Sequence, residues 1–196
     1  PYEKLIRDIK TAYQSANERG WDFIIPALCW MQGETDVNSY PGTNYQELLL
    51  KLTNDINHDI KQITGQEKDI EIICYQTNAL ARAEHFNPMA YECPETEVPQ
   101  TQLEMIREHK TFHASGPMYP YDCVNDIIHI DGLGQKKHGM LAGLAALDII
   151  QQKDNKRGLY PLKIKTKDAE VIIELQVPCP PLVIDTIQVA KADCYG

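Results

Sequence analysis

Apolar residues recur every three or four positions in four stretches of the chain, and this spacing predicts four amphipathic helices. We expect them over residues 2–18, 44–63, 98–110 and 133–152. The first two end near Gly20 and Gly65, as glycine commonly follows the last turn of a helix. The fourth is rich in Gly, Ala and Leu, a composition suited to close packing on a sheet.

Continuous apolar runs between these helices predict buried strands of the parallel type, over residues 22–30, despite Pro26, and residues 69–76. A weaker strand is expected around residues 111–119. Residues 32–43 form a polar stretch. Residues 78–97 show few periodic signals and are interpreted as a long loop, which in a compact domain is often functional. The alternation of helices and strands predicts an α/β domain with a parallel sheet over residues 1–153.

After the polar linker at residues 154–158 the period of the pattern changes to two. Apolar residues alternate over residues 162–166, 171–175 and 183–189. This alternation is typical of β-hairpins and β-sandwiches. Residues 160–196 are therefore predicted to be a small β-rich segment, the start of a β-sandwich-like module.

The predicted parallel sheet is smaller than usual. It has about three strands, whereas sheets commonly have about four to six. A sheet this small leaves edges exposed that doubly wound folds normally cover. We therefore expect that a strand and its helix precede Pro1. The chain begins with neither an initiator Met nor a signal peptide and stops soon after a strand-like run, so we interpret both ends as cut from a longer polypeptide.

Composition excludes several classes of protein. The chain has 196 residues, of which 43% are hydrophobic and 24% charged, and this is ordinary globular composition rather than that of a disordered or collagen-like chain. The apolar runs are too short to span a membrane. With 19 basic and 28 acidic residues, the net charge is −9. Such an acidic chain has no basic surface for nucleic acid or anionic lipid.

The six cysteines contain no Cys-x-x-Cys pair, so neither a zinc ribbon nor a thioredoxin-like site is expected. Cys29 and Cys74 lie in the apolar runs and are predicted to be buried free thiols. Disulfide pairing is the alternative. This cysteine usage points to synthesis in a reducing compartment.

A first candidate cluster follows the strand predicted at residues 22–30, and its sequence is Trp-Met-Gln-Gly-Glu-Thr-Asp over residues 30–36. Open α/β sheets bind ligands at the carboxyl ends of their strands. Gly33 permits close approach of a ligand to the backbone, and Gln32 and the Gly33 amide are donors that could face an oxyanion. Glu34 and Asp36 could form an acid/base pair as in glycosidases. The alternative for the whole cluster is an ordinary polar turn with solvated carboxylates.

A second candidate cluster contains Asp126 and His129, just before the last predicted helix. An aspartate three residues before a histidine can hold the ring Nδ1 and leave Nε2 as a base. The alternative is a loop histidine capped by a nearby aspartate.

Other motifs carry weaker hypotheses. His109 and His113 are four residues apart and could share a metal on one helix face, but they lack the Glu of His-Glu-x-x-His. The glycines at 132 and 134 lack the third glycine of a dinucleotide site. His138 is expected to be structural.

Taken together, the two clusters resemble the SGNH (GDSL-like) hydrolases, and most of all the sialate O-acetylesterase-like carbohydrate esterases. The resemblance covers residues 1–153 and rests on the Trp-x-Gln-Gly-Glu-x-Asp block followed by Asp-x-x-His. It implies a three-layer α/β/α sandwich with a flavodoxin-like parallel sheet. It also implies a serine esterase that removes acetyl groups from sugars without a metal or other cofactor.

The resemblance also implies roles for five residues. His129 matches the catalytic base and Asp126 its orienting acid. Gln32 and Gly33 fall in the block that contributes to the oxyanion hole, and Glu34 falls in the same block, where it holds the loop. The expected partners are an acetylated glycan and the N-terminal segment of the same protein, with no nucleic acid and no membrane span. We expect an extracellular, periplasmic or virion-associated place of action.

The chain departs from the family in one respect. The family's nucleophile lies in a Gly-x-Ser motif after the first strand, upstream of everything present here. Ser15 lies in a helix pattern, Ser39 in a loop and Ser115 before the Asp-x-x-His motif, and none has the strand-turn-helix context of a nucleophile. A non-catalytic glycan-binding or phage tail-type module on the same scaffold is therefore the alternative function.

Three expectations about geometry follow. Asp126 and His129 should be in side-chain contact. The Gln32–Glu34 block and His129 should line one cleft, with residues 78–97 at its rim. No serine of this chain should reach Nε2 of His129.

Overall fold

The computed structural model describes residues 1–39, 44–77, 98–124, 129–153 and 158–184. The elements in the α/β part, in chain order, are α1 (Tyr2–Glu18), β1 (Ala27–Trp30), α2 (Glu34–Ser39), α3 (Tyr45–Thr64), β2 (Glu71–Gln76), α5 (Val98–Glu108), β3 (Phe112–Pro117) and α6 (Gly132–Ile150). The hairpin strands β4 (Tyr160–Lys167) and β5 (Glu170–Gln176) follow. The four predicted helices are confirmed to within a few residues.

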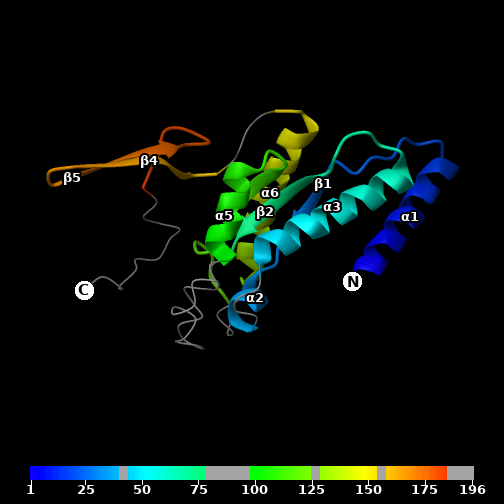
Figure 1. Cartoon of the computed structure of the whole chain (residues 1–196). Helices are drawn as coiled ribbons and strands as arrows, with labels where there is room; N and C mark the ends of the chain where they lie inside the picture. The colour runs from blue at the N-terminus through cyan, green and yellow to red at the C-terminus, as the bar shows by residue number, and fades with distance from the viewer. Residues whose placement is uncertain (40–43, 78–97, 125–128, 154–157, 185–196) are drawn as a thin grey trace.

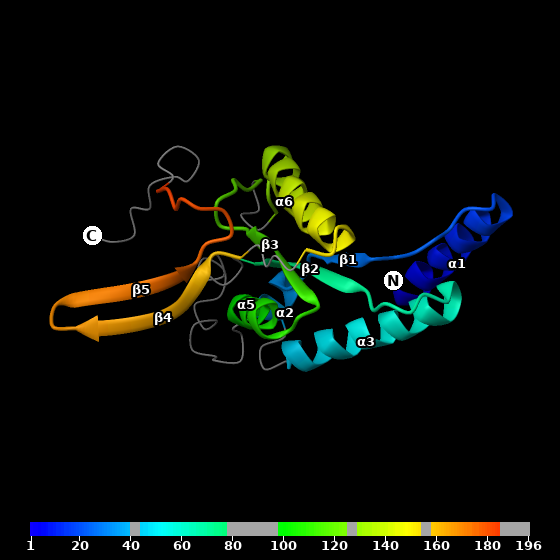
Figure 2. The same cartoon turned by 90° about the horizontal axis from the view of Figure 1, so that it is seen from above.

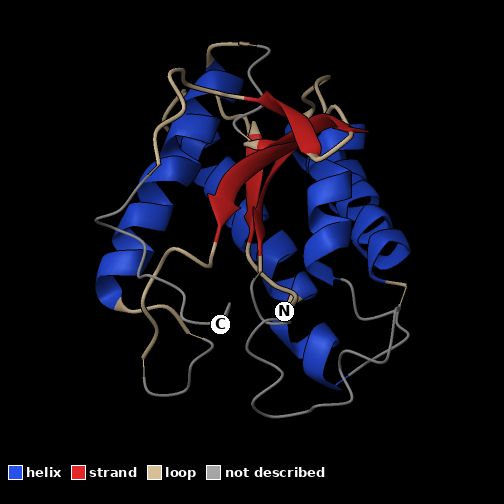
Figure 3. Cartoon of the chain, turned by 90° about the vertical axis from the view of Figure 1, so that its left-hand side faces the viewer, coloured by secondary structure: helices blue, strands red, loops and turns tan. Residues whose placement is uncertain are grey.

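The three strands β1, β2 and β3 form one parallel sheet in sequence order. Helices α3 and α5 lie on one side of this sheet and α6 lies on the other, as Figure 2 shows. Helix α1 packs against α3, as Figure 1 also shows. Figure 3 shows strands enclosed between helices on both sides. The predicted mixed α/β architecture with a parallel sheet is confirmed.

Most of the hydrophobic core lies between the sheet and the α3/α5 layer. Its buried members include Leu49, Ile56 and Ile60 of α3 and Met105 of α5, all at most 3% exposed. Helix α3 begins at Asn44, whose side chain accepts a hydrogen bond from the Glu47 amide. It ends at Gly65, where φ is +72°. The amphipathic pattern, the cap and the terminal glycine all favour the same element, which explains why the sequence predicts it well.

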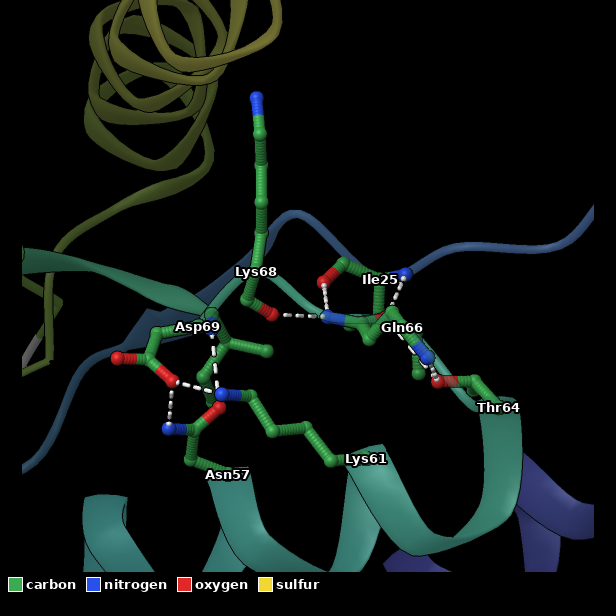
Figure 4. A network of polar contacts seen from close by, with 8 residues as sticks. Ile25, Asn57, Lys61, Thr64, Gln66, Lys68 and Asp69 are labelled. Atoms are coloured by element: carbon green, nitrogen blue, oxygen red, sulfur yellow. Dashed lines mark hydrogen bonds and ion pairs between the residues drawn. The ribbon is translucent and has the colours of Figure 1, made fainter.

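The strand predicted over residues 22–30 is shorter than expected, because only residues 27–30 pair with a neighbouring strand. Upstream of Pro26, the side chain of Gln66 takes the place of a neighbouring strand, as Figure 4 shows. Gln66 Oε1 accepts from the Ile25 amide and Gln66 Nε2 donates to the Ile25 carbonyl, both at 3.0 Å. Nε2 also donates to the Lys68 carbonyl at 3.0 Å, which ties the entry to β1 to the entry to β2.

A short helix, α2, lies in the stretch that the sequence predicts to be an irregular polar segment. Glu34 and Asp36 occupy its first turn, where negative side chains stabilise a helix. Ser39, expected in a loop, is the last residue of this helix.

Strand β1 is one edge of the sheet, since among the described residues it pairs with β2 alone. Leu28 and Trp30 pack against the core on the α3/α5 side, and Ala27 packs on the α6 side. Alternation places Cys29 on the α6 side too, and there it is exposed. The prediction that Cys29 is buried is therefore wrong, whereas Cys74 on the central strand β2 is fully buried as predicted.

The C-terminal segment begins with the predicted hairpin, in which β4 and β5 pair antiparallel (Figure 1). Cross-strand pairs join Lys163 to Glu174 on one face and Ile164 to Ile173 on the other. The two isoleucines are 60% and 51% exposed, so the apolar face of the hairpin is open. Residues 183 and 184 are not in a strand, and the rest of the strand predicted over residues 183–189 lies outside the described residues.

No described helix combines the length and the apolar character that a membrane crossing requires. This finding agrees with the expectation that the chain has no membrane span.

Candidate functional site at the carboxyl edge of the sheet

Both predicted clusters follow carboxyl ends of strands in one parallel sheet. The Gln32–Glu34 block comes directly after β1, and the His129 loop comes between β3 and α6. Because β1, β2 and β3 run parallel, their carboxyl ends meet at one edge of the sheet. That edge is where open α/β sheets keep their ligand sites.

A buried polar network holds the Gln32 carbonyl from the α3/α5 side. Tyr45 Oη at the start of α3 donates to the Gln32 carbonyl oxygen at 2.8 Å, and Gln102 Nε2 of α5 donates to the same oxygen at 2.8 Å. Gln102 Nε2 also donates to Tyr45 Oη at 3.0 Å, and Trp30 Nε1 donates to it at 3.1 Å. Burial, the largest cause, raises the pKa of Tyr45 above its ordinary range, so this phenol stays a donor at neutral pH.

Gly33 is buried and lies directly against the first turn of α5. Its φ is +154°, and a Cβ built there would come within 2.9 Å of Val98 Cγ1 and 3.0 Å of Gln102 Nε2. Only glycine fits this position without strain or displacement of its neighbours.

The two carboxylates of the block have separate partners. Glu34 Oε1 accepts from Tyr75 Oη at 2.5 Å and from Thr77 Oγ1 at 3.1 Å, which ties the start of α2 to the carboxyl end of β2. Asp36 accepts a hydrogen bond from the side-chain amide of Gln32. Burial and, next, the charge of Glu34 raise the pKa of Tyr75 well above its usual range. This arrangement fits Glu34 as a residue that holds the loop and gives no support to a glycosidase-type carboxylate pair.

The His129 loop is closed by a short antiparallel bridge between Cys123 and Ile130. The Val124 amide donates to the His129 carbonyl at 2.8 Å. Asp131 caps α6, because its side chain accepts from the Gly134 amide at 2.6 Å. His129 itself is exposed. Asp126 and the long segment 78–97 lie outside the described residues, so the predicted contact with Asp126 and the predicted rim of the cleft stay predictions.

Tyr75 connects the two clusters. Its ring is fully buried and packs in one cluster with Met118 and Ile130, the residue that follows His129. Its hydroxyl is the donor to Glu34. The two loops therefore contact the same side chain, although a shared cleft between them stays a prediction.

A serine–histidine pair that the sequence did not predict lies under this edge. Ser115 Oγ of β3 is 3.5 Å from His138 Nε2 of α6, and both residues are at least nine-tenths buried. Nδ1 of His138 has no hydrogen-bond partner among the described residues. Burial lowers the pKa of His138, so the ring is neutral at pH 7.

This pair is relevant to the expectation that no serine of the chain reaches Nε2 of His129. Ser115 has His138 as its partner, and Ser15 lies on α1, which packs against α3. That no serine reaches Nε2 of His129 stays a prediction.

The structure does not support the hypothesis that His109 and His113 bind a metal from one helix face. Helix α5 ends at Glu108, so His109 and His113 do not share a helix face. His113 lies on β3, where its Nε2 contacts the Glu71 carboxylate. Within the described ranges, no group of three or more His, Cys, Asp or Glu residues is placed to hold a metal ion.

Three residues of the edge were not predicted from the sequence, namely Tyr45, Tyr75 and Gln102. One signal for Gln102 was present. It occupies the apolar stripe of α5 together with Val98, Met105 and Ile106, and a polar residue on such a stripe needs a buried partner.

Comparisons with known proteins give no match. No protein-family model matches the chain, and no curated protein or solved structure matches it either.

Proposed function

We propose that this chain belongs to a carbohydrate O-acetylesterase of the SGNH type that uses a Ser-His-Asp mechanism. His129 is the base, and Asp126 orients it. The nucleophilic serine comes from a segment of the same protein N-terminal to Pro1. The Gly33 amide, with the Gln32 region, binds the oxyanion, and Glu34 holds the loop in place.

One observation carries the proposal: a Gln-Gly peptide held by buried donors follows β1, and an exposed histidine lies in the loop after β3, so both come after carboxyl ends of the same parallel sheet. The Gln32 carbonyl accepts two buried donors, and Gly33 has no room to move toward α5. Preorganised donors of this kind stabilise the tetrahedral intermediate of acyl transfer. His129 is accessible to substrate.

The reaction follows from these roles. The serine oxygen attacks the acetyl carbonyl carbon while its proton passes to Nε2 of His129. Negative charge forms on the carbonyl oxygen, facing the Gly33 amide. The intermediate then breaks its bond to the sugar oxygen, which takes the proton from His129. Water attacks the acetyl-enzyme in the same way, and acetate leaves.

The surface beside β1 is consistent with an upstream segment that consists of a strand and a helix and carries the serine. The outer edge of β1 has no partner strand among the described residues, and Cys29 is exposed on the side of the sheet that α6 covers only in part. The adjacent helix α6 has partly exposed apolar side chains at Leu133, Met140, Leu141, Leu144, Leu147 and Ile150, which are 39–63% exposed.

An edge strand and a neighbouring apolar helix face are covered together by one additional strand and its helix. A strand added parallel to β1 would end at the carboxyl edge next to the Gln32–Glu34 block. A serine at that end would lie near the Gly33 amide. The proposed segment thus supplies both the missing cover and the missing nucleophile.

The test is hydrolysis of p-nitrophenyl acetate and release of acetate from an O-acetylated sugar by the protein that includes its upstream segment. We expect activity that a serine-directed organophosphate abolishes. His129→Ala should abolish it as well, and Asp126→Asn should lower kcat by about 10⁴-fold. The exposed His58 on α3 provides the matched control, because His58→Ala should leave the rate unchanged.

Activity that survives His129→Ala, or no hydrolysis of any acetyl ester, would refute the proposal. Binding of the acetylated sugar without hydrolysis would instead favour the glycan-binding module.

A further inference from the structure

Gln102 is a fully buried polar residue whose side-chain amide is satisfied entirely within the network around Gln32. Nε2 donates to the Gln32 carbonyl and to Tyr45 Oη, and Oε1 accepts from the Thr77 amide at 2.8 Å. A methionine would fill nearly the same volume on this apolar stripe without any polar group to satisfy. The hydrogen bonds of Gln102 therefore add direction rather than packing.

The direction matters because a trans peptide group points its C=O and its N–H to opposite sides. Two donors from the α3/α5 side hold the Gln32 carbonyl. The N–H of the same peptide, which belongs to Gly33, must then point away from α3 and α5. No hydrogen-bond partner for this N–H lies among the described residues.

The close contact with α5 leaves the loop no alternative position. Val98 and Gln102 both lie against Gly33, so the peptide can neither shift toward the helix nor rotate without breaking the two bonds to the carbonyl. A donor held in this way needs no reorganisation when charge develops on the substrate.

We propose that Gln102 is a positioning residue that, together with Tyr45, fixes the Gln32–Gly33 peptide so that the Gly33 N–H is presented to the oxyanion. This inference rests on the proposed esterase function. Gln102 touches no substrate and acts only through the peptide that it holds.

The position of the peptide can be measured in the 196-residue chain by NMR. Gly33 is the only one of the 11 glycines that follows a glutamine. Labelling with ¹³C-carbonyl glutamine and ¹⁵N-glycine therefore gives a single correlated signal, from the Gln32 carbonyl and the Gly33 amide. We expect Gln102→Met to shift this signal, because the carbonyl loses a donor. Gln100→Met, the same change at an exposed site of the same helix, should leave the signal in place.

The consequence for catalysis is measured in the protein with its upstream segment. We expect Gln102→Met to lower kcat by about 10²-fold with little change in KM, because the lost alignment affects the transition state and not the bound substrate. Tyr45→Phe, which removes the other donor, should act in the same direction. It also replaces Gln102→Met if that variant does not fold.

The outcomes separate the two claims. An unshifted signal, or wild-type kcat in Gln102→Met and Tyr45→Phe, would refute the positioning role and leave the esterase proposal intact. Absence of hydrolysis by the wild-type protein would refute the esterase proposal and the oxyanion role with it, while the NMR signal would still show whether Gln102 holds the peptide.

Discussion

Substitution of Gly33 by alanine tests the geometry of the candidate site directly, without reference to activity. Alanine at φ +154° stores strain of about 1–3 kcal/mol. The added methyl also comes within 2.9 Å of Val98 Cγ1 and 3.0 Å of Gln102 Nε2, and overpacking of this kind costs about 1–3 kcal/mol. If Gln102 moves away, its hydrogen bonds are lost instead, at about 1 kcal/mol each. We therefore expect Gly33→Ala to lower the free energy of unfolding by about 3 kcal/mol.

The same substitution at Gly139 is the matched control. Gly139 lies inside α6, and a Cβ there would meet nothing within 4 Å. Gly139→Ala should raise the free energy of unfolding by about 0.5–1 kcal/mol, because alanine is the better helix former. Urea unfolding followed by circular dichroism measures both variants. A Gly33→Ala variant within about 0.5 kcal/mol of the wild type, the usual effect of a surface substitution, would contradict the close contact with α5.

Three further predictions concern other parts of the fold. Gln66→Ala should lower the free energy of unfolding by about 1–3 kcal/mol, because the Ile25 backbone loses its partners, whereas Gln62→Ala, at an exposed site in the last turn of α3, should change it little. In titration with Ellman's reagent, Cys29→Ser should remove one fast-reacting thiol, and Cys74→Ser should leave the fast phase unchanged, since Cys74 is buried and burial raises its pKa to about 12. Because burial lowers the pKa of His138, the unfolded chain binds the proton of this residue at a higher pH than the folded chain does. The free energy of unfolding should therefore fall as the pH drops below the ordinary histidine pKa of about 6.5. Urea unfolding at two pH values should show a smaller decrease for His138→Gln than for the wild type.

The regular elements could be predicted from the sequence wherever several local signals agreed. For α3, the apolar stripe, the Asn44 cap and Gly65 all favour one helix, and the structure has it from Tyr45 to Thr64. For β2, a continuous apolar run predicts a strand that is buried on both faces, as the central strand of the sheet is.

Prediction failed where an interaction distant in sequence replaced a local one. Residues 22–26 have the composition of a strand, but the backbone of Ile25 is paired by the side chain of Gln66, 41 positions away. Cys29 lies in an apolar run, yet its exposure depends on β1 being an edge, which no local pattern encodes.

The candidate site divides in the same way. The loop residues Gln32, Gly33 and His129 stand out in the sequence because they follow strands and carry donors or a base. Tyr45 and Gln102 do not, because their role depends on α3 and α5 meeting the same carbonyl oxygen. Such a meeting becomes visible only in three dimensions.

Buried contacts of Tyr75 couple the positions of the two loops at the carboxyl edge of the sheet. Tyr75 holds Glu34 through its hydroxyl and packs against Ile130 through its ring, while the ring of His138 lies against Tyr75 and Tyr121. A displacement of the His129 loop must therefore move the ring that anchors the Gln32–Glu34 block. Because tightly packed interiors transmit such shifts instead of absorbing them, the two loops should keep their relative position as a unit. In the proposed esterase, these two loops form one half of the active site, and the proposed serine-bearing segment docks at the open edge of β1.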